Sequence, residues 1–245
     1  MKSNEIKEEI LDLRGGKRMS RDLLPNEIPG AVPLLHVLEK GDAFIFPATP
    51  HVLRVLLLLN GKASFSDGGE VIIYDEKAVY IDAPQRAVTV SALENASVLE
   101  IQWDLTDAEA AALANGDLPF TQTFEASLKY RDPFKSEKTV SRAIVPHRIL
   151  PRFAMGSVET HGTDLIGQHA HPLLDQFFFS FPENDCILLI DSFQHPMKGN
   201  TILHIPLGSN HGVFVGEKQC ASYLWIDFIP DERGLAYLDE VHKPV

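Results

Sequence analysis

The sequence contains little cysteine. Cys186 and Cys220 are the two thiols in 245 residues, too few for the disulfide framework of a small secreted domain. Both stand in apolar, strand-like runs, where buried free cysteines are common. We therefore expect two free thiols and a location in the reducing cytoplasm, with the periplasm as the alternative.

Long hydrophobic runs are also missing. The longest wholly apolar stretches, such as Val55 to Leu59, are far shorter than the roughly 20 residues that a membrane helix needs. The N-terminal stretch MKSNEIKEEILDLRGG is charged and amphipathic, and it lacks the apolar centre of a signal peptide. We expect no membrane partner.

Positive charge is scarce. The chain has 22 Lys and Arg against 34 Asp and Glu, which gives a net charge of −12. A nucleic-acid partner requires a basic face, and no segment resembles a helix-turn-helix. The hydrophobic content of 44% and the charged content of 23% are those of an ordinary globular protein. We therefore expect a small-molecule partner and no nucleic acid.

What the sequence does contain is a series of short strands. From Leu34 to Leu105, apolar runs alternate with turn residues at a spacing of roughly ten residues, and the pattern returns after residue 119. Asn60-Gly61 is a strong signal for a β-hairpin turn, and Asp67-Gly68-Gly69 marks a second turn. This spacing predicts an all-β sandwich or barrel.

Two helices are expected as well. Thr106 and Glu109 form a capping box before an alanine-rich run, and Gly116 is placed to end it. This helix, within 106–118, is expected to connect two β units. A second short helix is predicted over residues 5–13, from apolar residues on one side.

The two β units read as repeats of one another. VLRVLLLLNG matches LLDQFFFSFPEN in position, AVYIDAP matches TILHIPLG, and VLEIQWDL matches SYLWIDF. The offset stays close to about 120 residues, which indicates duplication of one domain.

Four residues in the second unit suit one metal ion. His169 and His171 are separated by one residue, so on a strand both side chains point to the same face. Gln176 follows after an interval long enough for a turn, and His211 follows the turn Pro206-Leu207-Gly208. Imidazole ligands favour a transition metal over calcium or magnesium. If the strand register slips by one, Asp175 replaces Gln176 as the ligand.

At these residues the sequence resembles the cupin superfamily. The first cupin motif has His-x-His, four residues and then Glu, and the second has Pro-x-Gly-x-x-His; here they read HAHPLLDQ and PLGSNH. The resemblance covers roughly residues 140–228, and Gln176 stands where the family usually has Glu. It implies a double-stranded β-helix, or RmlC-like jelly roll, that binds one divalent transition metal such as Fe, Mn, Ni, Co or Zn.

Together with the repeat, the resemblance predicts a bicupin, which is two such barrels in one chain. The expected parts are an N-terminal helix and lead-in (1–33), a degenerate barrel without metal ligands (34–105), the connecting helix (106–118), the metal-binding barrel (119–230) and a tail (231–245). The positions of the first repeat that correspond to the ligands carry Pro47, Thr49 and Arg54, with Ala87 near the last. One metal per chain is therefore expected. Exposed sheet edges also make a homodimer possible.

The reaction at such a metal site depends on the side chains around the metal. Arg152 is a candidate partner for a substrate carboxylate, and Glu159 or His161 is a candidate general acid or base. The alternative for Glu159 and His161 is a solvated strand end. Tyr223 and Asp227 share a strand face with Trp225, which forms either a wall of the pocket or a contact between barrels.

We interpret the chain as a metal-binding bicupin enzyme. The expected substrate is a small anion, such as a sugar acid or keto acid, and the expected reaction is that of an isomerase, lyase or dioxygenase. The alternative is a non-catalytic barrel that binds or senses a small molecule.

Overall fold

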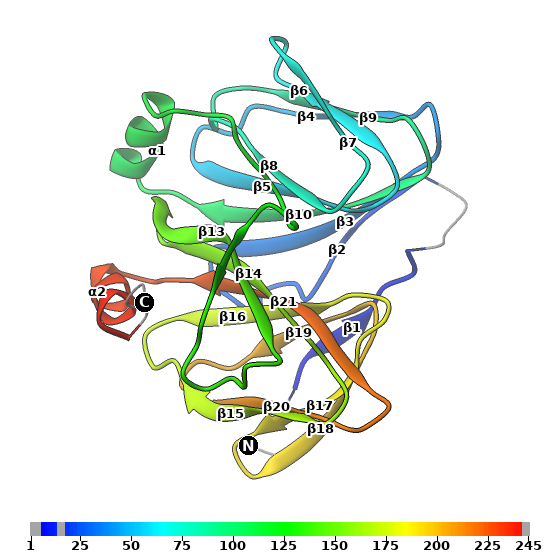
Figure 1. The fold of residues 1–245 in the computed structure, drawn as a ribbon. Coiled ribbons are helices and arrows are strands. Elements are labelled where there is room, and N and C mark those ends of the chain that lie inside the picture. The colour runs from blue at the N-terminus through cyan, green and yellow to red at the C-terminus, as the bar shows by residue number, and fades with distance from the viewer. Residues whose placement is uncertain (1–5, 14–17, 242–245) are drawn as a thin grey trace. The chain divides into compact units, whose positions relative to one another are not determined.

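The computed structural model describes residues 6–13 and 18–241. The chain divides into two compact units, which we call the first and the second barrel. The first barrel is formed by residues 12–126, and the second by residues from 127 onward together with the N-terminal segment up to Leu11 (Figure 1). Among the described residues, neither helix has the length and apolar character needed to cross a membrane.

The first barrel consists of a six-stranded and a four-stranded antiparallel sheet. The larger has the order β11-β8-β5-β10-β3-β2, and the smaller has the order β4-β9-β6-β7. Their strands are β2 (Met19–Asp22), β3 (Ala31–Leu38), β4 (Ala43–Phe46), β5 (Val52–Asn60), β6 (Ala63–Ser66), β7 (Val71–Tyr74), β8 (Ala78–Ile81), β9 (Val88–Ala92), β10 (Ala96–Asp104) and β11 (Phe120–Thr123). Alternate residues such as Phe65, Tyr80 and Val98 form its buried core.

The second barrel has one branched sheet whose main path is β1-β19-β16-β21-β14-β13-β12. Its strands are β1 (Glu8–Ile10), β12 (Leu128–Tyr130), β13 (Val140–Leu150), β14 (Phe153–His161), β15 (Asp164–Ala170), β16 (Asp175–Ser180), β17 (Asp185–Ile190), β18 (Phe193–Lys198), β19 (Thr201–Ile205), β20 (Asn210–Val215) and β21 (Cys220–Phe228). β15 pairs with β20, and β17 pairs with β18, β20 and β21. This branch carries two of the three histidines of the site.

The predicted duplication is confirmed by the strand order. The run β8-β5-β10-β3 of the first barrel has its counterpart in β19-β16-β21-β14 of the second. These pairs include the three sequence matches that indicated the repeat. Each run is extended by a strand from elsewhere in the chain, because β11 pairs with β8 and β1 pairs with β19.

The helix predicted over residues 5–13 is wrong for the described residues. Glu8–Ile10 is a strand paired with Thr201–Leu203, while Ile6 and Leu11 on either side are buried. The apolar spacing suits a helix, but the hydrogen-bonding edge of β19 stabilises an extended segment instead. The lead-in also holds strand β2, and the first barrel continues to β11, beyond the expected boundary at 105.

The Asn60-Gly61 turn is real but is not a hairpin. β5 belongs to the six-stranded sheet and β6 to the four-stranded sheet, so this turn carries the chain from one sheet to the other. Gly61 has a φ of 82°, and a Cβ there would lie 2.0 Å from the carbonyl oxygen of Asn95. The glycine is required by the close approach of two backbones. The hairpin is at Asp67-Gly68-Gly69, between β6 and β7.

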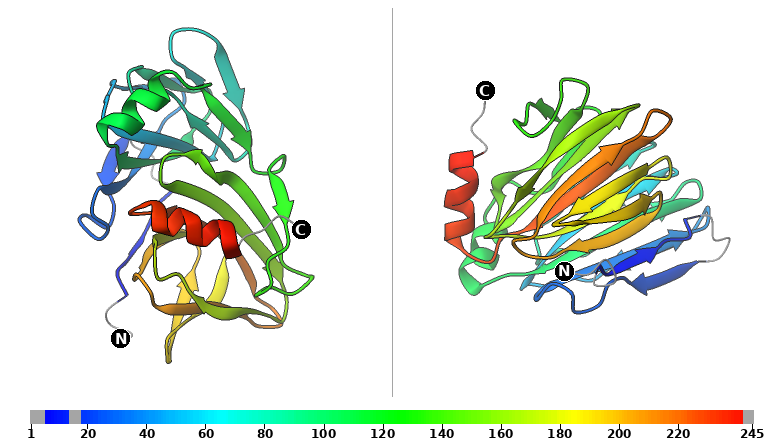
Figure 2. Two further views of the ribbon diagram at one scale, coloured as in Figure 1. Left: turned by 90° about the vertical axis from the view of Figure 1, so that its left-hand side faces the viewer. Right: turned by 90° about the horizontal axis from the view of Figure 1, so that it is seen from below.

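The two helices differ in how well the sequence predicts them. α1 (Asp107–Ala114) has the expected capping box between Thr106 and Glu109. α2 (Glu232–Val241) lies in what was expected to be a tail. Its Leu235 and Leu238 pack with Leu174 and Ile229, so α2 lies against the second barrel (Figure 2). Leu174 belongs to the turn that separates His171 from Gln176, and α2 therefore supports that turn.

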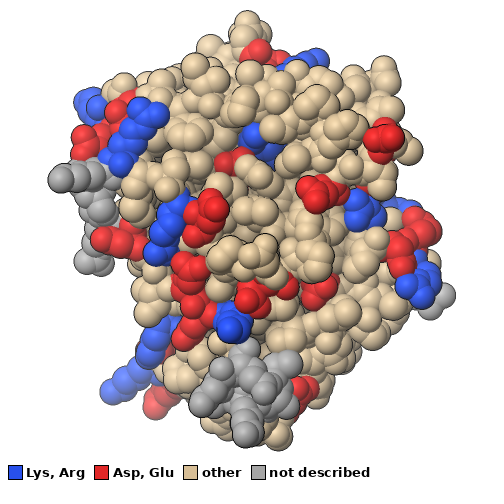
Figure 3. Space-filling view, turned by 180° about the vertical axis from the view of Figure 1, so that it is seen from behind, with Lys and Arg blue, Asp and Glu red and all other residues tan. Residues whose placement is uncertain are grey.

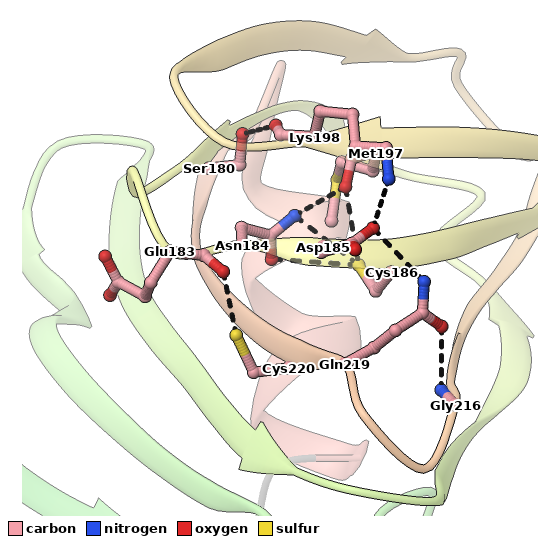
Figure 4. Close-up of polar contacts among 10 residues, drawn as sticks. All are labelled: Ser180, Glu183, Asn184, Asp185, Cys186, Met197, Lys198, Gly216, Gln219 and Cys220. Carbon is pink, nitrogen blue, oxygen red and sulfur yellow. Dashed lines mark hydrogen bonds and ion pairs between the residues drawn. The ribbon is translucent and has the colours of Figure 1, made fainter.

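Both cysteines are free thiols, as expected. Cys186 is buried in the core of the second barrel, and burial raises the pKa of its thiol to about 12. Asn184 orders the turn before β17 by donating a hydrogen bond to the carbonyl of Met197 and accepting one from the amide of Ser222. Figure 4 shows Cys220 on the neighbouring strand, with its thiol donating to the carbonyl of Glu183.

Charged side chains of both signs are interspersed on one face of the molecule. On the face shown in Figure 3, Lys and Arg lie in small groups next to Asp and Glu and do not form a broad basic patch. This distribution agrees with the acidic net charge of −12.

Candidate metal centre

Three histidines meet inside the second barrel. Their potential ligand nitrogens lie within 4.8 Å of one another. His169 is on β15, His171 follows that strand directly, and His211 is on β20, which pairs with β15 so that His169 and His211 are opposite each other. Alternation on one strand and register between two strands therefore bring the three imidazoles together.

A tight turn delivers the third histidine. The carbonyl of Pro206 accepts hydrogen bonds from the amide and the hydroxyl of Ser209, at 3.0 and 2.7 Å. Gly208 has a φ of 73°, the conformation that the third position of a type II turn requires. The Pro-x-Gly motif thus reverses the chain after β19, and β20 begins at Asn210, directly before His211.

Two of the imidazoles are held in one tautomer. Nδ1 of His169 lies 2.9 Å from the carbonyl of Gly167, and Nδ1 of His211 lies 3.2 Å from the carbonyl of Ser209. A carbonyl can only accept, so each Nδ1 carries the proton and each Nε2 has a free electron pair. Burial, with His169 nearby, lowers the pKa of His211 to about 4. The imidazole of His211 is therefore neutral at neutral pH.

Gln176 faces the same cavity from β16. Its Nε2 donates to Asp227 Oδ1 at 2.7 Å, which leaves Oε1 as the buried end of the amide, with no hydrogen-bond partner among the described residues. A buried acceptor in this state is what a metal ion satisfies, so the residues fit the expected ion. Asp175 faces the other side of the strand, where His204 lies 3.5 Å away. Of the two candidates, Gln176 is thus the one that faces the cavity.

The cavity is lined by both polar and apolar side chains. It is lined by Tyr130, Lys135, Val158, Ile166, His169, His171, Gln176, Phe178, His211, Gly212, Val213, Tyr223, Trp225 and Asp227. The face of β21 that was expected to form either a wall or a contact is therefore a wall of this cavity. Burial raises the pKa of Asp227 to about 7.

The structure does not bring the three predicted catalytic residues, Arg152, Glu159 and His161, to the lining of this cavity. Val158 lines the cavity from β14, and because strand side chains alternate, Glu159 and His161 face away from it. Glu159 forms an ion pair with Arg142 at 2.9 Å, and His161 is exposed at the strand end. Arg152 lies in the turn between β13 and β14, with a φ of 51°, and is not among the lining residues.

Sequence reasoning missed a lysine. Lys135 lines the cavity from the segment between β12 and β13, and its Nζ lies 2.8 Å from Asp132. Both side chains are largely buried, with 7% and 11% of their surfaces exposed. The spacing Asp-x-x-Lys was the available signal, but nothing local distinguishes a buried pair from a solvated one.

The first barrel contains an ion-pair network at the corresponding place. Arg54, which matches Gln176 in the repeat, donates to Glu100 at 2.7 Å. Glu100 also contacts His36 at 2.8 Å and accepts from Gln102 at 2.9 Å. Among the described residues, the one group of histidines and acidic residues with metal-binding geometry is in the second barrel. In the first barrel, the charge of Arg54 is thus compensated by the carboxylate of Glu100.

Comparison with known proteins gives a fold. No protein-family description and no curated protein matches this sequence. Solved structures do match. A cupin 2 conserved barrel domain protein from Leptotrichia buccalis is 14% identical, with a TM-score of 0.63 over 91% of this chain and 96% of that one. An oxalate decarboxylase from Lactobacillus farciminis, in complex with formate, is 12% identical, with a TM-score of 0.65 over 94% and 86%.

A third similar structure has a different description. It is an IolB-like protein from Salmonella typhimurium, 13% identical, with a TM-score of 0.62 over 82% of this chain and 84% of that one. The three comparisons cover 91%, 94% and 82% of this chain, so each extends over both of its barrels. The chain therefore has the cupin fold and is of the bicupin type, with two barrels in one polypeptide.

Proposed function

We propose that this protein binds one divalent transition metal in its second barrel and acts there as an enzyme on a small anionic substrate. The observation that carries the proposal is the convergence of His169, His171 and His211 on one point, beside the buried Oε1 of Gln176. Three neutral imidazoles and a neutral carboxamide are ligands typical of a transition metal.

The ligand set supports the choice of an anionic substrate. None of the four side chains carries a negative charge, so a divalent ion keeps its full charge and attracts an anion to its open positions. Such an ion would supply a Lewis acid that polarises a substrate oxygen. A structure of the same fold is an oxalate decarboxylase in complex with formate, which is a precedent for a small carboxylate.

The experiment starts with metal content. The metal content of protein purified without added metal is measured by elemental mass spectrometry. The protein is then prepared anaerobically in its Fe(II) and Mn(II) forms. Each form is incubated with small hydroxy acids and keto acids. We expect close to one metal per chain and turnover of one acid class. Binding without turnover favours a sensor, and a chain that takes up no metal contradicts the proposal.

The role of Gln176 can be tested by charge. Gln176→Glu together with Asp227→Asn should bind metal about tenfold more tightly, because a carboxylate ligand adds Coulomb attraction. The second change is needed because Gln176 lies 2.7 Å from Asp227, where two carboxylates repel. Metal competition titrations measure the effect, with Asp227→Asn alone as the control. Unchanged affinity would mean that Gln176 is not a ligand.

A further inference from the structure

Lys135 is the one cationic side chain of the described chain that lines the cavity beside the three histidines. It comes from the segment 131–139, between β12 and β13. Its side chain is 7% exposed, and among the described residues Asp132 is its ion-pair partner, at 2.8 Å. An ammonium has three donors, so one carboxylate neighbour does not satisfy it. The Nζ of Lys135 also lies 5.5 Å from the centroid of the Tyr130 ring, and the lysine lines the cavity that a ligand would enter.

The segment is fixed in place by several contacts. The ring of Phe134 stacks on His169, with centroids 4.5 Å apart and an angle of 11° between the planes. The carbonyl of Phe134 accepts a hydrogen bond from Gly167 at 2.7 Å, and its amide donates to Asp132 at 2.9 Å. The side chain next to Lys135 is thus packed on a candidate metal ligand. This packing holds the ammonium in the cavity and limits the entropy lost when an anion binds.

The charge around Lys135 leaves room for an anion. Asp132 is close enough to neutralise the ammonium, and the buried Asp227 is the other acidic residue that faces it. A divalent ion on the four neutral ligands adds two positive charges to this enclosed space. Burying that excess without an anion is unfavourable, so the site selects a negatively charged ligand.

Four apolar side chains of the lining restrict the chemistry of the rest of the ligand. Val158, Ile166, Phe178 and Val213 line the cavity and have no polar side-chain atoms. A sugar acid has several hydroxyl groups, and each hydroxyl left without a partner against such a wall costs binding energy. A short alkyl group fits the same wall favourably.

From these observations we propose that Lys135 binds the carboxylate of a short-chain 2-oxo or 2-hydroxy acid, whose apolar end lies along Val158, Ile166, Phe178 and Val213. The inference rests on the proposed function and narrows its substrate class. The other oxygen of the acid faces the three histidines. Of the two classes first expected, keto acids and sugar acids, this wall favours the keto acid.

The test is calorimetric titration of metal-loaded protein with 2-oxobutyrate, gluconate and neutral 2-butanone. Lys135→Met removes the charge and keeps the chain length. Lys138→Met is the matched control, because Lys138 is exposed on the same segment and donates to the carbonyl of Thr163. Asp132→Asn with Lys135→Met removes both charges, in case the single variant leaves Asp132 buried alone and fails to fold.

We expect wild type and Lys138→Met to bind 2-oxobutyrate alike, and both Lys135 variants to bind it about tenfold or more weakly. Gluconate and 2-butanone should bind wild type about tenfold or more weakly than 2-oxobutyrate does. Equal affinity in Lys135→Met or the double variant, or tighter binding of gluconate, would overturn the proposal.

Metal content is measured on every sample, which separates the two proposals. If the wild-type protein takes up no metal, the proposed function is contradicted. The same titrations of the metal-free protein then test whether Lys135 binds the acid. Normal metal content with no effect of Lys135 contradicts this inference alone.

Discussion

The double change His169→Ala and His171→Ala should abolish metal binding and leave the protein folded. Two of the three imidazoles are lost, and neither His211 nor Gln176 can hold a transition metal without them. The buried core of the second barrel is formed by apolar side chains such as Leu188, Val215 and Tyr223, which these changes do not touch. Elemental analysis gives the metal per chain, and circular dichroism gives the fold.

His161→Ala is the control for this pair. His161 is exposed at the end of β14 and is not among the lining residues, so the variant should keep close to one metal per chain. A wild-type stoichiometry near two would place a second ion elsewhere in the chain and contradict the expectation of a single site. Metal retained by the double variant would show that the histidines are not ligands.

Glu100→Gln should destabilise the protein by about 3–5 kcal/mol, because it leaves the buried guanidinium of Arg54 without a counter-charge. The side chains of Arg54 and Glu100 are 8% and 3% exposed, so water cannot replace the lost carboxylate. Metal content should not change, since the site lies in the other barrel. Urea denaturation measures the loss, and Glu94→Gln, at an exposed position, is the control with no expected effect.

Because the carboxylate of Glu100 can be protonated, the stability that is lost in Glu100→Gln depends on pH. Burial alone raises the pKa of Glu100, but hydrogen bonds with His36, Gln102 and Arg54 outweigh it, and the pKa is lowered from its usual 4.5. A lowered pKa contributes stability that is present above the unfolded value and is lost as the pH falls through the folded one. The difference between wild type and Glu100→Gln should therefore shrink in acid below pH 4.5. An equal difference at all pH values would contradict this account.

The sequence predicts the metal centre better than its surroundings. His169 and His171 are two apart on a strand, and a fixed turn precedes His211, so local geometry and one strand pairing place all three. Lys135 could not be found in this way. It reaches the cavity because Phe134, on the same segment, packs on His169, and this contact joins residues distant in the chain.

The direction in which side chains point on β14 explains why Glu159 and His161 do not line the cavity. Glu159 and His161 have suitable chemistry, but which face of β14 points inward depends on its pairing with β13 and β21. The residues of β14 alone do not show which face of the strand points inward. The short strand at Glu8–Ile10 is a similar case, because three residues are too few for a periodic pattern, and their partner is a sheet edge far along the chain.

That N-terminal strand also sets an order for folding during synthesis. β1 leaves the ribosome long before β19, its partner, so Ile6 and Leu11 must wait until the first barrel has been made. The first barrel is thus inserted between two parts of the second. A polypeptide that began at residue 127 would lack β1 and expose the edge of β19 at Thr201–Leu203, where another chain can pair with it. When the second barrel is produced by itself, the N-terminal segment up to Leu11, which contains β1, should therefore be included.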